Sequence, residues 1–87
     1  MLTPNINERL LAIIHFHGYS LYRYAKVSSM STSVLYALKE KRSLPSLQTI
    51  YTISRHFNID LELIFAKDFQ KALLHLANTP PQSSFLP

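Results

Sequence analysis

Residues 20–40 decide the fold and read SLYRYAKVSSMSTSVLYALKE. Ser20 is a helix-capping residue, and the apolar residues after it recur at spacings of three and four, which predicts a helix of two turns. The residues expected to face inward in this helix are Leu21, Tyr24, Ala25 and Ser28. The hydroxyl-rich segment 28–31 then competes with the helical backbone for hydrogen bonds, so we expect a tight break there.

A second helix is expected over residues 32–40, with Ser31 as its cap. We expect Val34, Leu35 and Leu38 to point inward. The outward residues are Thr32, Ser33, Tyr36, Ala37 and Lys39. Residues 20–40 therefore predict a short capped helix, a break of about three residues, and a second helix with small polar residues in its first turn.

This arrangement suits the reading of double-stranded DNA. The major groove admits one α-helix, whose N-terminal residues reach the edges of the bases. Hydroxyl groups can donate to or accept from bases, and the methyl groups of Thr32 and Ala37 can contact a thymine methyl. The candidate base-reading residues are Thr32, Ser33, Tyr36 and Ala37. The alternative interpretation is that Thr32 and Ser33 are only first-turn residues and that Tyr36 is partly core.

Positive charge is concentrated in the middle of the chain. The net charge is +4, and between Arg23 and Arg55 there are six basic residues against the single acid Glu40. Lys39, Lys41 and Arg42 follow the helix that we expect to enter the groove. Its C-terminal end approaches the sugar-phosphate backbone in that pose, where each ionic contact releases a counterion. The alternatives are a solvated face or simple capping of the helix dipole.

Helices are also expected on both sides of this unit. The first covers residues 5–17, with Asn5 and Glu8 at capping-box spacing and Gly18 ending it in a left-handed conformation. Its expected inward residues are Ile6, Leu10, Ile13, Ile14 and His17. A fourth helix over 47–57 is capped by Ser46, with a stripe formed by Leu47, Ile50, Tyr51, Ile53, Ser54 and Phe57.

A fifth helix begins after Asp60, with Leu61, Ile64 and Phe65 facing inward. The stripe continues through Phe69, Ala72, Leu73 and Leu76, so this helix either runs unbroken to Ala77 or breaks near Lys67. We divide the chain into a helix-turn-helix domain (1–66), a C-terminal helical extension (67–77) and a disordered, mobile tail (78–87). The candidate dimer or partner contacts are Phe69, Leu73 and Leu76, with Phe85 as further apolar material; alternatively, this segment only packs on the core.

The span from about Glu8 to Phe65 resembles the lambda-repressor-like helix-turn-helix family of phage Cro and repressor proteins, also called the XRE family. The matching segments are Ser20 with Tyr24-Ala25, the turn 28–31, the helix TSVLYALKEKR, Pro45-Ser46-Leu47 with Thr49-Ile50, and residues 57–61. The resemblance implies a compact, all-α, five-helix DNA-binding domain. It further implies a bacterial or phage transcriptional repressor that binds a palindromic operator as a homodimer.

The resemblance also implies phosphate contacts at Leu21, Lys41, Arg42 and Ser43. Together with the basic residues, the candidate phosphate-contacting residues are Ser20, Arg23, Lys39, Lys41, Arg42 and Ser43. Three positions depart from the family pattern. Leu21 stands where the family often has a glutamine, Ser29 replaces a turn glycine, and Lys41 replaces the glycine that commonly follows the recognition helix. Ser29 is therefore expected to accept a positive φ at a cost of about 1 kcal/mol.

Composition excludes several other classes of protein. The chain has 87 residues, an apolar share of 47% and no cysteine, which together favour one folded domain in a reducing, cytoplasmic compartment. Its apolar runs are shorter than the ~20 residues that span a bilayer, and no basic signal-peptide segment opens it, so we expect no membrane association or export.

Neither a metal or cofactor site nor catalysis is expected. His15 and His17 are two residues apart and point to different sides of a helix, and His56 and His75 are isolated. The chain has no cysteine nucleophile and no glycine-rich phosphate loop. A rival interpretation keeps the fold and changes the function: a helix-turn-helix protein can act through a protein partner, as the antitoxin of a toxin-antitoxin pair or as a phage-encoded inhibitor of host defence.

Overall fold

The computed structural model describes residues 5–40 and 44–80, which form six helices and no strand. The helices are α1 (Ile6–Phe16), α2 (Leu21–Ser28), α3 (Thr32–Glu40), α4 (Leu47–His56), α5 (Leu61–Phe65) and α6 (Gln70–Asn78). The prediction of an all-α chain is confirmed, and the bounds of α1 and α4 differ from the predicted ones by one residue at most. Residues 41–43 and 81–87, with the predicted contacts Lys41, Arg42, Ser43 and Phe85, lie outside the described residues.

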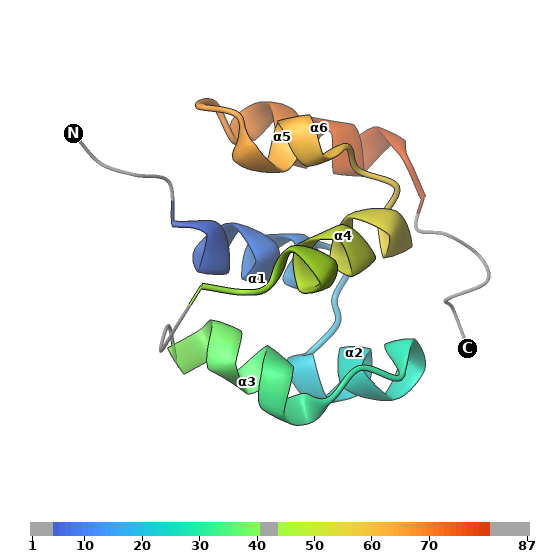
Figure 1. Ribbon diagram of the computed structural model, residues 1–87. Coiled ribbons are helices and arrows are strands. Elements are labelled where there is room, and N and C mark those ends of the chain that lie inside the picture. Colours follow the sequence, from blue (N-terminus) through green and yellow to red (C-terminus); the bar gives the residue numbers. More distant parts are fainter. Residues whose placement is uncertain (1–4, 41–43, 81–87) are drawn as a thin grey trace.

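Helix α1 is the central element, since it packs against each of the other five helices. Figure 1 shows α1 and α4 in the middle of the molecule, with α2 and α3 on one side and α5 and α6 on the other. Apolar residues of α1 at spacings of three and four fill the space between these layers: Ile6, Leu10, Ile13 and Ile14. Ala72 and Leu76 of α6 join the same core, so the predicted C-terminal extension packs on the body.

The predicted helix caps are confirmed at three starts. The backbone N–H groups of Glu8, Arg23 and Thr49 donate to the side chains of Asn5, Ser20 and Ser46 over 3.2, 3.1 and 3.2 Å. Asp60 stands at the N-cap of α5 but makes no side-chain cap hydrogen bond. Gly18 has a φ of 86°, as predicted, and nothing lies within 4 Å of a Cβ placed there. The backbone conformation, and not a lack of space, therefore requires this glycine.

The predicted stripes of α4 and α5 were too wide. Leu47 and Tyr51 are 70% and 50% exposed, and Phe65 is 50% exposed. The buried residues of these segments are Ile50, Ile53, Ser54, Phe57 and Ile64. Tyr51 and Phe65 lie about 100° around the helix axis from the buried Ile50 and Ile64, so they remain in solvent even though their spacing is helical. Leu47 is the first residue of α4.

The helix that begins after Asp60 breaks near Lys67, because α5 ends at Phe65 and α6 begins at Gln70. Of the two predicted alternatives, the broken helix is confirmed. The Arg9 guanidinium of α1 donates to the carbonyl of Ile64 over 2.8 Å, to that of Ala66, and to that of Lys67 over 3.4 Å. It also lies over the Phe69 ring, 4.9 Å from the ring centroid. Arg9 thus satisfies carbonyls that are left free where α5 ends. It fixes the α5–α6 connection to α1.

Candidate nucleic-acid interface

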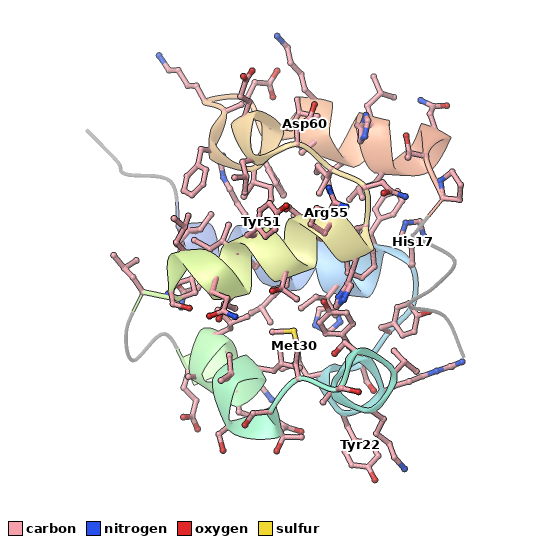
Figure 2. The ribbon with its side chains drawn as sticks, turned by 45° about the vertical axis from the view of Figure 1, so that its right-hand side comes forward. His17, Tyr22, Met30, Tyr51, Arg55 and Asp60 are labelled. Atoms are coloured by element: carbon pink, nitrogen blue, oxygen red, sulfur yellow. The ribbon has the colours of Figure 1, made fainter. Side chains whose placement is uncertain are left out.

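The break between α2 and α3 is built from serine side chains. Ser28 Oγ donates to the Tyr24 carbonyl over 2.6 Å and accepts from the Met30 N–H over 3.3 Å. Ser29 has a φ of 62°, so the predicted left-handed residue of the turn is confirmed. Figure 2 shows Met30 pointing from this turn toward α4. The turn therefore reverses the chain with local hydrogen bonds and is anchored by one apolar side chain that packs against the core.

Helix α3 is fixed to the body along one narrow side. Leu35 and Leu38 are buried, and Asn7 Nδ2 of α1 donates to the Leu38 carbonyl over 3.4 Å. At the N-terminal end, the Ser33 N–H donates to Ser31 Oγ over 3.2 Å. Val34 is 39% exposed, so its predicted inward position is wrong. One turn separates Leu35 from Leu38, and Val34 lies on the flank of that narrow contact.

The rest of α3 faces solvent. Thr32, Ser33 and Lys39 are exposed, Tyr36 is 40% exposed and Ala37 is half-buried. Within residues 5–40 and 44–80, no side-chain hydrogen bond or ion pair involves Thr32, Ser33, Tyr36 or Lys39. The fold does not use the polar groups that we selected as base readers, and they remain free to bind another molecule.

Two hollows flank α3. The first, which we call the α1–α3 hollow, has a volume of about 260 Å³ and is lined by His15, Ser20, Leu21, Tyr22, Tyr36 and Lys39. It brings together a predicted base reader, Tyr36, and two predicted phosphate contacts, Ser20 and Lys39. Sequence reasoning missed His15, because nothing in the spacing of the chain places this residue of α1 in one hollow with Tyr36 and Lys39 of α3.

The second hollow, of about 230 Å³, lies between α3 and the start of α4. Its lining residues are Val34, Ala37, Leu38, Leu44, Pro45, Ser46 and Thr49. Ala37 therefore lies on the opposite flank of α3 from Tyr36. The four predicted base readers do not form one cluster: Thr32 and Ser33 share the exposed first turn, and the other two line separate hollows.

The cations of α2 are held over tyrosine rings. Arg23 lies 5.5 Å from the ring centroid of Tyr19, and Lys26 lies 5.1 Å from that of Tyr22. Tyr22 projects from the lower edge of the molecule in Figure 2. Leu21 is only 7% exposed, so the phosphate contact that the family resemblance implied for its side chain is wrong: the residue belongs to the core.

A partly buried polar contact joins α2 to α4. Tyr24 Oη lies 2.6 Å from His56 Nδ1. Burial lowers the pKa of the His56 imidazole below its ordinary value and raises the pKa of the Tyr24 phenol above its ordinary value. Both shifts favour the neutral forms, in which a phenol donates to an imidazole nitrogen. This hydrogen bond helps to hold α2, and the turn after it, against α4.

The residues predicted as dimer or partner contacts at the C-terminus pack, wholly or in part, against the core of the chain. Leu76 is 1% exposed, and Phe69 and Leu73 are partly buried against the core. His75 Nε2 lies 2.8 Å from the Asn58 carbonyl, and Asn58 Nδ2 donates to the Pro80 carbonyl over 3.0 Å. The inner face of α6 is thus used within the chain, while its exposed apolar residue, Leu74, was not predicted.

The described residues were also compared with what a metal site or a membrane-spanning helix requires. No group of three or more histidine or acidic side chains there is arranged to hold a metal ion. No described helix is long and apolar enough to cross a bilayer. Comparisons with models of protein families, with curated proteins and with solved structures found no match to this chain.

Proposed function

We propose that this chain is a sequence-specific, double-stranded-DNA-binding transcriptional regulator of the lambda-repressor-like (Cro, XRE) type. It inserts α3 into the major groove and represses transcription from a palindromic operator as a homodimer. One observation carries the proposal: α3 stands out from the body after a three-residue turn, with the hydroxyls of Thr32 and Ser33 exposed in its first turn and unused by the fold. A groove-reading helix needs such a turn.

The charges near α3 support a polyanionic partner. Between Ser20 and Glu40, the only acid is Glu40 itself, and the cations are Arg23, Lys26 and Lys39. In the proposed pose, Ser20, Arg23 and Lys39 contact the DNA backbone beside the groove. Lys41, Arg42 and Ser43, which follow α3 in the sequence, extend that contact in the proposal. Phosphate contacts of this kind position a protein on the duplex, while base contacts specify the sequence.

In this proposal Thr32 and Ser33 read bases, and Tyr36 and Ala37 read from the two flanks of α3. Two copies bind half-sites about 34 Å apart on one face of the duplex. The protein uses no cofactor or metal and catalyses no reaction. It acts in the cytoplasm of a bacterium, where the DNA of the host or of a phage is accessible.

A second candidate function is favoured by exposed apolar side chains. Leu44, just before α4, is 79% exposed, Leu47 at its start is 70% exposed, and Leu74 on α6 is 65% exposed. Side chains of this size on a surface are typical of contacts with another protein when they gather in a patch. The second candidate is therefore an antitoxin, or a phage-encoded inhibitor of host defence, that acts through a protein partner.

Selection of bound duplexes from a random pool, at two salt concentrations, tests the proposal. We expect enrichment of a palindromic motif, with weaker binding at the higher salt concentration because counterions are released on binding. A Thr32→Ala/Ser33→Ala variant should lose the motif and keep weak, salt-dependent binding. A Thr52→Ala variant on α4 is the control. No enrichment by the wild type would contradict DNA reading and favour the protein-partner function.

A further inference from the structure

The polar side chains that line the α1–α3 hollow are either basic or carry a hydroxyl group. Its polar lining consists of the Lys39 ammonium, the His15 imidazole, the phenols of Tyr22 and Tyr36 and the hydroxyl of Ser20. None of these residues is acidic. The ammonium, the phenols and the hydroxyl can donate a hydrogen bond to an anion, and the imidazole can do so when it is protonated. The residues come from three helices, so tertiary packing has brought them together. Its lining therefore favours an anionic group.

The volume of the hollow limits the size of that group. At about 260 Å³ it lies below the range of roughly 300 to 1,000 Å³ that is usual for sites that enclose a whole small molecule. A single phosphate group is small enough to enter. Because the hollow lies beside the exposed face of α3, the backbone of a duplex bound there would present phosphates to it.

The hydrogen bond of His15 fixes the role of each ring nitrogen. Nδ1 lies 2.7 Å from the Tyr19 carbonyl oxygen, which can only accept, so Nδ1 carries a proton. In the neutral ring Nε2 is then an acceptor. It cannot form a hydrogen bond with a phosphate oxygen, because that oxygen is also an acceptor. When His15 is protonated, Nε2 becomes a charged donor. Nε2 has no hydrogen-bond partner among the described residues.

From these observations we propose that His15 is a further DNA-contacting residue: the α1–α3 hollow seats one backbone phosphate, and protonation of His15 strengthens that contact. This inference rests on the proposed DNA-binding function and adds to it a contact from α1 and a dependence on pH. The titratable groups that face His15 are Tyr22 from α2 and Tyr36 and Lys39 from α3. No residue of α4, α5 or α6 lines the hollow.

The direction of the pH effect follows from these charges. A phosphate seated in the hollow favours the protonated imidazole over the neutral one, because the cation donates a charged hydrogen bond to it. Binding is therefore accompanied by proton uptake. Affinity for DNA therefore rises as pH falls, and one proton limits the change to about tenfold per pH unit.

The test measures Kd for the selected duplex by fluorescence anisotropy, at constant ionic strength, between about pH 8 and pH 5.5. We expect the wild type to bind roughly three- to tenfold more tightly at the lower pH. His15→Asn, whose amide can still donate to the Tyr19 carbonyl, and His15→Gln should lose most of this dependence. His75→Gln, a change on α6 away from the hollow, should keep it. Circular dichroism at each pH shows whether each variant is folded, and only folded samples are compared.

A second pair of variants tests the phosphate contact itself. Lys39→Gln should weaken binding several-fold. It should also reduce the slope of log Kd against log salt concentration by about one unit, the change expected for the loss of one phosphate contact. Lys71→Gln, the same change on α6, should alter neither. The inference is overturned if His15→Asn and the wild type show the same pH dependence. Absence of binding to any duplex at any pH would instead contradict the proposed function, and the phosphate contact with it.

Discussion

Helices α3 and α6 have nine residues each, and each buries two apolar side chains: Leu35 and Leu38 in α3, Ala72 and Leu76 in α6. Their polar side chains are used differently. His75 of α6 contacts the Asn58 carbonyl, and Arg9 fixes the approach to α6 through three carbonyls. On α3, in the part of the chain that the structure describes, the side chains of Thr32, Tyr36 and Lys39 contribute no hydrogen bond to the fold.

This difference separates a structural helix from a candidate binding helix. Both are held by similar apolar contacts, so burial alone does not distinguish them. Polar groups that the fold leaves unpaired on a rigid element can bind a partner without disrupting packing. We therefore propose that the contacts of α6 serve stability and that the outer face of α3 serves recognition, and the variants that follow test the two parts of this proposal separately.

The largest effect is expected for Leu76→Ala. This change leaves a cavity in the core and should lower the free energy of unfolding by about 2 to 5 kcal/mol, measured by urea denaturation. Leu35→Ala in α3 should cost a similar amount, because both side chains are buried. If Leu76→Ala left stability unchanged but altered the oligomeric state, Leu76 would be a contact between chains and the comparison would fail.

Arg9→Ala should have the next largest effect. It removes a charged donor from the carbonyls of Ile64, Ala66 and Lys67 and the cation from the Phe69 ring. We expect a loss of about 1.5 to 3 kcal/mol and faster hydrogen exchange of the α6 amides than of the α3 amides. Lys71→Ala is the control for loss of charge on this side. Equal acceleration in α3 and α6 would show that Arg9 does not act locally.

For α3 the expected effect is on binding. Thr32→Ala should cost about 1 to 3 kcal/mol at particular base pairs and change the free energy of unfolding by less than about 0.5 kcal/mol. Competition assays with single-base operator variants, alongside thermal denaturation, measure the two quantities. A loss of affinity that is uniform across all sequences would argue against base reading by Thr32.

The smallest effect concerns the two half-buried histidines, His17 and His56. Burial lowers the pKa of His17 and of His56 from the ordinary value of about 6.5. The unfolded chain therefore takes up protons first as pH falls below about 6.5, so stability is lost there until each folded-state pKa is reached. His17 stacks on Phe57, and His17→Phe keeps that contact without titrating. The Tm of this variant should fall less at acidic pH; parallel profiles would exclude His17 as a cause.

Local chemistry made much of the fold predictable. The caps at Asn5, Ser20 and Ser46, the positive φ at Gly18 and the left-handed Ser29 each depend on neighbours within three residues. Such interactions are specified by residue type and position, whatever the rest of the chain does. The exposure of Thr32 and Ser33 was predictable for a similar reason, from the Ser31 cap and the spacing of Leu35 and Leu38.

Long-range contacts were not predictable in the same way. The break after α5 is fixed by Arg9, more than 50 residues away in the sequence. Periodicity gave the angular positions of Tyr51 and Phe65 but not which flank would meet the core. The α1–α3 hollow depends on the packing of three helices, so the position of His15 in its lining had no signal in the sequence.

The most direct test of the central claim is a titration of the ¹⁵N-labelled protein with the selected duplex, followed by amide chemical shifts. Our account predicts the largest changes in residues 31–39 and around Ser20, with α6 nearly unaffected. Changes centred on α6 or on the exposed face of α4, with α3 unperturbed, would contradict it.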